Sequence, residues 1–205
     1  PAYRRALALP GDTLETYRAL ARTLKWLERD SEVMQVLSEG LSRYPNHQGM
    51  SSSLARTALA AGDWKTGWRH YVCRQSSIQR APVPEHHVFA LQTDRPLRVC
   101  FDQGLGDELQ FLRFLPALVA RGVKVHYWCD EKLYPLLVNQ PNIEKLEILK
   151  PGEAGEYDCL VGDLPLLTDM RTDADIPPPL PLTVDKDRRQ VLREQLSSFG
   201  PPPYL

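Results

Sequence analysis

The sequence lacks the features that mark several classes of protein. No apolar run in its 205 residues approaches the roughly 18 needed to cross a bilayer, and the first residues hold no signal-peptide-like apolar stretch. The formal net charge of -1 gives no excess of positive charge for nucleic acid or an anionic membrane. The 4 cysteines include no Cys-x-x-Cys pair, which disfavours redox motifs and common zinc sites. We therefore expect a cytoplasmic protein with reduced cysteines, no membrane span and no nucleic-acid partner.

A repeat with a period of 34 residues runs through the first third of the chain. The tetrapeptide Leu-Ala-Arg-Thr at residues 20–23 returns at residues 54–57, and the same offset separates Leu37 from Tyr71. This period, with apolar residues at helical spacing, is typical of paired helices in the tetratricopeptide repeat. Residues 1–79 therefore resemble about two and a half tetratricopeptide repeats.

Two interpretations of these repeats remain open. Small residues at Ala21, Ala55 and Gly67 would let the helices of each pair approach closely and form a concave surface. Such a surface could bind a protein or peptide, or the array could be a spacer or a dimerisation surface, which leaves a homo-oligomer possible. Repeats need neighbours to cover their apolar faces, so either further repeats or the domain that follows must cap them.

The middle of the chain predicts a boundary and then a change of fold. Residues 80–95 have prolines and no helical periodicity, which indicates a linker. Its adjacent His86 and His87 lack further ligands at metal-binding spacing, so we predict loop residues and no metal site. The predicted fold class is α + α/β, with helical hairpins followed by a Rossmann-like parallel α/β domain over residues 96–205.

Strand-like and helix-like segments alternate in this second part. Apolar runs at Leu97–Asp102 and Lys124–Asp130 predict buried strands, and residues 143–149 and 157–162 predict two more. Asp107–Gly122 between the first two predicts one helix that ends at its glycine. Since parallel strands need crossover connections, this order predicts a parallel sheet covered by helices.

The turn after the first of these strands carries the chemically most distinctive residues. Gly104 and Gly106 stand among three carboxylates, those of Asp102, Asp107 and Glu108. The glycines predict an unusual backbone conformation and close approach of a ligand. The pattern matches neither G-x-G-x-x-G nor G-x4-G-K-[ST], and the carboxylates would repel a phosphate, so we exclude a pyrophosphate loop here.

A hydroxyl that must lose a proton would suit this turn better than a phosphate. The helix dipole keeps a carboxylate in the first helical turn ionised, so Asp107 could act as a general base. Magnesium binding is a weaker interpretation because the remaining oxygen ligands are missing at recognisable spacing. The plain structural interpretation is that Asp107 only caps the helix.

A family resemblance adds to this interpretation. Residues 102–125 resemble the start of the α/β domain that follows tetratricopeptide repeats in bacterial glycosyltransferase-like proteins. That domain is similar to the acceptor half of heptosyltransferases, and Gly106, Asp107 and Pro116 match their Gly-Asp turn and proline-containing helix. The resemblance implies that Asp107 is the catalytic base. The acceptor-binding residues expected around it are Gln103, Gly104, Gly106 and Gln110.

The same resemblance implies a second domain that binds a nucleotide-sugar donor, in the arrangement known as GT-B. Its first strand would begin near residues 203–205, so we expect this chain to carry the acceptor half, as a fragment or a natural half, with no cofactor and no activity alone. Two functions therefore compete. One is a sugar transferase whose repeats bind a protein or peptide acceptor. The other is a non-catalytic interaction module with a remnant α/β domain.

Overall fold

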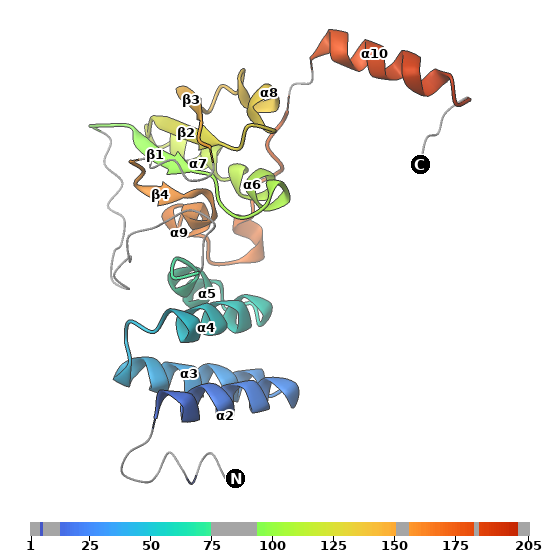
Figure 1. Ribbon diagram of the computed structural model, residues 1–205. Coiled ribbons are helices and arrows are strands. Elements are labelled where there is room, and N and C mark those ends of the chain that lie inside the picture. Colours follow the sequence, from blue (N-terminus) through green and yellow to red (C-terminus); the bar gives the residue numbers. More distant parts are fainter. Residues whose placement is uncertain (1–4, 6–12, 75–93, 151–155, 183–184, 201–205) are drawn as a thin grey trace.

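A computed structural model describes residues 5, 13–74, 94–150, 156–182 and 185–200 (Figure 1). Most of the predicted linker at residues 80–95 lies outside the described residues, as do residues 203–205, where a further strand was expected. None of the described helices is long and apolar enough to cross a membrane. The four cysteines, all among the described residues, form no disulfide, as predicted.

The helical part is a stack of hairpins. Its helices are α2 (Leu14–Trp26), α3 (Asp30–Arg43), α4 (Gln48–Ala60) and α5 (Trp64–Tyr71), and each packs on the next (Figure 1). The backbone N–H groups at the starts of α2 and α5 are capped by the side chains of Thr13 and Asp63. The predicted helical hairpins are confirmed.

The repeat places equivalent residues in equivalent surroundings. Leu20 and Leu54 are both buried, as are Ala21 and Ala55, which follow them at the same offset. The hairpins close tightly at Gly67, where a Cβ would lie 2.4 Å from Leu59 Cδ2. Small residues therefore set the helix spacing, as the sequence indicates.

The second part is a parallel sheet covered by short helices. The strands are β1 (Leu97–Cys100), β2 (Val125–Cys129), β3 (Lys145–Ile148) and β4 (Cys159–Leu160), in the order β3-β2-β1-β4. Its short helices are α6 (Leu105–Leu112), α7 (Leu115–Val119), α8 (Tyr134–Leu137) and α9 (Leu164–Leu167). Helix α10 (Lys186–Ser197) follows them, has no buried residue and lies apart from the sheet (Figure 1). The predicted α + α/β class is confirmed.

The single helix predicted for residues 107–122 is wrong, because the chain forms α6 and α7 there. Helix α6 already begins at Leu105, and α7 begins at Leu115 with Pro116 in its first turn. Pro116 has no N–H to donate to the carbonyl of Leu112, and its ring would clash there, so the helix breaks. Gly122 ends the segment with φ +81°, as expected for a stop glycine.

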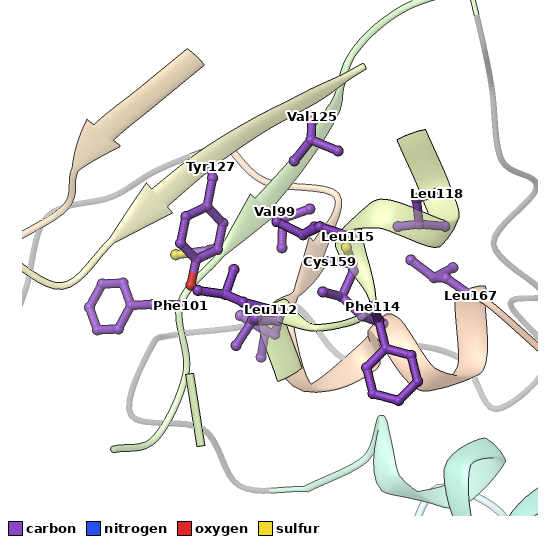
Figure 2. Close-up of a cluster of buried hydrophobic side chains, with 14 of the residues drawn as sticks. Val99, Phe101, Leu112, Phe114, Leu115, Leu118, Val125, Tyr127, Cys159 and Leu167 are labelled. Atoms are coloured by element: carbon purple, nitrogen blue, oxygen red, sulfur yellow. The ribbon is translucent and has the colours of Figure 1, made fainter. Parts of the chain in front are cut away.

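The core of the α/β part extends into the helical part. Figure 2 shows side chains of β1, β2, α6 and α7, among them Val99, Tyr127 and Leu112, packed into one cluster. Trp68 of α5 belongs to the same cluster, and its ring meets the edge of Phe111 at a centroid distance of 6.0 Å. The α/β part therefore covers the apolar face of α5, the last helix of the hairpins.

Candidate functional site

The turn singled out from the sequence lies where the order of the sheet changes direction. From β1 the chain proceeds to β2 and β3 on one side, whereas β4 pairs with β1 on the other. Ligands of open α/β sheets bind at the carboxyl ends of strands at such a switch point. The turn from Asp102 to α6 occupies that position.

The backbone of the turn differs from the prediction. The left-handed residue is Gln103, with φ +61°, whereas Gly104 is extended and Gly106 lies within α6. The expectation that the glycines supply an unusual backbone conformation is therefore wrong. A Cβ on Gly106 would meet no other residue within 4 Å, so packing within the described residues does not require a glycine there.

Asp107 is not the residue that caps the helix. Gly104 occupies the N-cap position of α6, and Asp107 stands three residues later, in the first turn. Its Oδ2 would lie 3.8 Å from a Cβ on Gly104, so the exposed carboxylate is turned back toward the start of the helix. The capping interpretation is wrong, and the carboxylate remains open to solvent.

The structure brings the predicted site residues together on one exposed surface. The Gln103 amide donates a hydrogen bond to the Tyr71 hydroxyl of α5, with 3.3 Å between Nε2 and Oη. Burial raises the pKa of Tyr71, and the negative charge of the nearby Asp107 contributes in the same direction. Gln110 is exposed one turn further along α6. The acceptor-binding and catalytic roles stay predictions.

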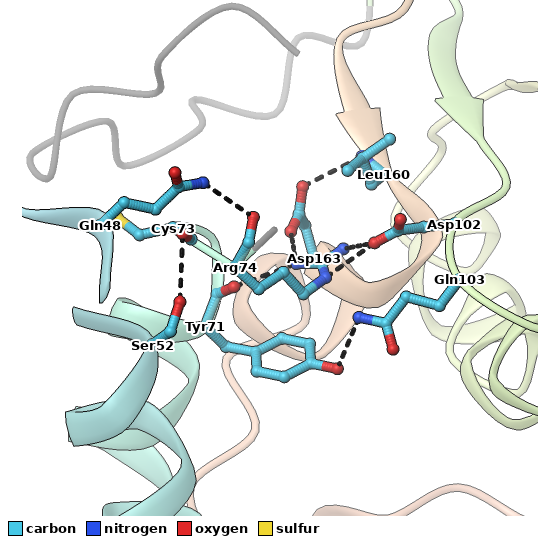
Figure 3. A network of polar contacts seen from close by, with 9 residues as sticks. All are labelled: Gln48, Ser52, Tyr71, Cys73, Arg74, Asp102, Gln103, Leu160 and Asp163. Carbon is cyan, nitrogen blue, oxygen red and sulfur yellow. Dashed lines mark hydrogen bonds and ion pairs between the residues drawn. The ribbon is translucent and has the colours of Figure 1, made fainter. Parts of the chain in front are cut away.

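Sequence reasoning missed a buried ion cluster beneath this surface (Figure 3). Arg74 follows α5, and its Nε lies 2.7 Å from Asp102 Oδ2, while its Nη1 lies 2.6 Å from Asp163 Oδ1. The guanidinium also lies over the Tyr71 ring, 4.5 Å from its centroid. Burial alone would lower the pKa of Arg74, but Asp163 and Asp102 raise it, so the cation is kept.

Two backbone features complete the cluster. The second carboxylate oxygen of Asp163 accepts a hydrogen bond from the Leu160 N–H at 3.0 Å. A Cβ on Gly162 would lie 2.6 Å from Arg74 Nη2, so the arginine fills the space that this glycine leaves. Asp102 is therefore a paired, buried group and not one of three charges facing a ligand.

Glu108 is also buried, although the sequence suggested a charge beside the turn. Its side chain is 1% exposed, and its Oε1 accepts a hydrogen bond from the Tyr127 hydroxyl at 2.7 Å. Burial raises the pKa of Glu108 to about 7, while the Tyr127 hydrogen bond lowers it. Of the three carboxylates, Asp107 alone is exposed.

Two cavities lie along the helical part, and the second of them reaches the turn. The first, which we call the hairpin groove, has a volume of about 480 Å³ and is lined by residues of α2, α3 and α4, including Trp26. The second, the junction cavity, has about 450 Å³ and reaches Tyr71, Arg74 and Gln103. Gly49 and Arg56 of α4 line both cavities, so the two cavities adjoin along this helix, and together we call them the trough.

Within the part of the chain that the structure describes, no group of three histidine, cysteine or acidic side chains could hold a metal ion. Comparisons with family models, with curated proteins and with solved structures found no match. The likeness to heptosyltransferases therefore stays a prediction. The functional interpretation depends on the geometry of the trough and the turn.

Replacing Arg74 with methionine should destabilise the protein by about 3–5 kcal/mol, because two buried carboxylates lose their cation. Urea unfolding followed by circular dichroism measures this loss. Arg56→Met is the matched control, since Arg56 is exposed and has no ion pair with the described residues, and it should change stability by less than ~0.5 kcal/mol. A loss below ~1 kcal/mol for Arg74→Met would show that the cluster contributes little.

Glu108→Gln should remove a pH dependence of stability. Because the pKa of Glu108 rises from 4.5 to about 7 on folding, its contribution is complete below pH 4.5 and is lost as the pH rises through 7. At pH 8 the variant should therefore be more stable than the wild type, by on the order of 2 kcal/mol.

The measurement is the difference in unfolding free energy between variant and wild type from pH 4 to pH 8. Glu131→Gln supplies the control, since it makes the same substitution at an exposed position. A constant difference for Glu108→Gln would contradict the assignment of a raised pKa to the buried carboxyl.

Proposed function

We propose that this chain binds a protein segment along the trough and presents one of its hydroxyl groups to Asp107 for sugar transfer. The observation that carries this proposal is that the two cavities adjoin at Gly49 and Arg56. A segment that lies in the hairpin groove beside Trp26 would cross these two residues to reach Gln103, next to the start of α6.

The shape of the trough suits an extended segment. Its two ends lie on elements far apart in the sequence, at α2 and at the turn after β1, and the ion cluster of Arg74 forms part of its floor. Segments held by a groove gain affinity when the groove is fixed before binding. The buried contacts of Arg74 supply that rigidity at the junction.

Asp107 has the chemistry that a general base needs. Its exposed carboxylate stands in the first turn of α6 and is open to solvent. It would take the proton of the acceptor hydroxyl while that oxygen forms its bond to the anomeric carbon of the sugar. The bond from this carbon to the donor phosphate breaks at the same time, and the nucleotide leaves with the electron pair. The donor would be a nucleotide-sugar bound by a second domain.

A non-catalytic interaction module is the second candidate. One observation favours it, because Asp107 is not among the residues that line either cavity. In that case the trough binds its partner and the turn has no chemical role. The two candidates differ only in what Asp107 does.

Asp107→Asn should separate them. Peptides selected from a random display library against the 205-residue chain supply the binding measurement. A protein that joins this chain to a donor-binding domain, supplied with a panel of nucleotide-sugars, supplies the transfer measurement. Asp107→Asn should bind peptides like the wild type and lose transfer by a factor of ~10² to 10⁴, since an amide accepts no proton.

The matched control is Asp187→Asn, because Asp187 is also an exposed aspartate in the first turn of a helix, α10. It should keep both binding and transfer. If Asp107→Asn transfers sugar at the normal rate, Asp107 is not the catalytic base, and only the interaction module remains as a candidate function. Failure to select any peptide would contradict both candidates.

A further inference from the structure

The charged side chains of the hairpin groove indicate what kind of segment it takes. We infer that the segment is acidic and extended, with carboxylates at alternate positions. The inference rests on the proposed function, since it names the chemistry of the segment that the trough binds. The groove has four cations and a single anion along its walls, namely Arg18, Arg22, Lys25, Arg56 and Glu15.

This positive charge is local. The whole chain has a formal net charge of -1, so the groove differs in sign from the molecule that carries it. A cleft of one sign concentrates ligands of the opposite sign and favours their approach. The charge of the groove therefore selects among protein segments.

Two of the arginines are available to a ligand. Arg22 and Arg56 are exposed, and neither forms an ion pair with any of the described residues. They occupy equivalent places in the repeat, each the third residue of a Leu-Ala-Arg-Thr tetrapeptide. The repeat thus places one arginine of each hairpin on the same groove, which a random scatter of surface charge would not do.

The other two cations have weak partners. Arg18 forms an exposed ion pair with Glu15, and Lys25 Nζ lies 2.8 Å from Asp30 Oδ1, also at the surface. Exposed pairs of this kind contribute only about 0–1 kcal/mol, so a ligand carboxylate can compete for the cation. The groove therefore offers more positive charge than Arg22 and Arg56 supply.

The spacing of the cations fits an extended chain. Arg18 and Arg22 lie one turn apart on α2, which corresponds to a rise of about 6 Å. Side chains on one face of an extended segment repeat every two residues, or about 6.6 Å. Carboxylates at alternate positions would therefore meet successive cations of α2. Beside them Trp26, 84% exposed, offers an apolar contact at the rim of the groove.

Three labelled ten-residue peptides test the inference with the 205-residue chain. They share one serine and one leucine and carry glutamate, glutamine or lysine at alternate positions. Fluorescence anisotropy should show the glutamate peptide binding at least tenfold more tightly than the glutamine peptide, with no binding of the lysine peptide. The affinity should fall as salt rises from about 50 to about 300 mM, because exposed charges are screened.

Charge reversal locates the binding. Arg22→Glu and Arg56→Glu should each weaken binding of the glutamate peptide at least tenfold. Arg193→Glu is the matched control, since it makes the same change on exposed helix α10 outside the groove and should leave the affinity unchanged. Equal losses for all three variants would mean that binding follows net charge and not the groove, which would overturn the inference.

The outcomes separate this inference from the proposed function. If the glutamine or lysine peptide binds as tightly as the glutamate peptide, the acidic segment is wrong, but a segment-binding trough stands. The same holds if library-selected peptides bind while none of the three designed peptides does. If neither designed nor selected peptides bind, both the inference and the proposed function fail.

Discussion

The arrangement of this protein depends on one buried cation between two carboxylates. Arg74 comes from the end of the helical hairpins, Asp102 from the end of β1 and Asp163 from the segment after β4. Taking such charges out of water is costly, so they are retained only where geometry and further hydrogen bonds satisfy them. Here the guanidinium binds both carboxylates and lies over the Tyr71 ring. Asp163 also accepts a hydrogen bond from the backbone N–H of Leu160. The cluster therefore fixes the orientation of the hairpins relative to the sheet.

That orientation determines the candidate site. Because Asp102 is held by Arg74, the residue that follows it, Gln103, reaches Tyr71 and lines the junction cavity together with α4. The aromatic contact between Trp68 of α5 and Phe111 of α6 joins the same two parts and removes apolar surface from water. The junction cavity exists only while the hairpins keep this position relative to the sheet, because it is lined by residues of both parts.

The sequence supports the coarse fold well and the site only in part. The 34-residue repeat and the alternation of strand and helix patterns are local signals, and they predicted the α + α/β class correctly, although one predicted helix is two in the structure. The position of the turn at the end of β1 also follows from such signals. The contacts of Arg74 do not, because its partners lie 28 and 89 residues away and only the tertiary fold brings them together. The burial of Glu108 was missed for the same reason, since nothing in its immediate sequence shows which side of α6 faces Tyr127.

One error had a local cause that the sequence did contain. Pro116 stands inside the segment first interpreted as one helix, and its missing N–H is a sufficient reason for the break between α6 and α7. The left-handed turn was assigned to glycines, whereas the backbone uses Gln103 and keeps Gly104 extended. Composition shows where a turn occurs, but the residue that takes the strained conformation is fixed by the contacts around it, here with Tyr71.

The shared core and the ion cluster join the hairpins and the α/β part into one cooperative body at α5 and Arg74. Differential scanning calorimetry of the 205-residue chain measures this cooperativity. We expect one transition whose calorimetric enthalpy equals its van't Hoff enthalpy, because neither part can unfold without exposing the shared core and ion cluster. Two separate transitions, one for the hairpins and one for the sheet, would contradict it.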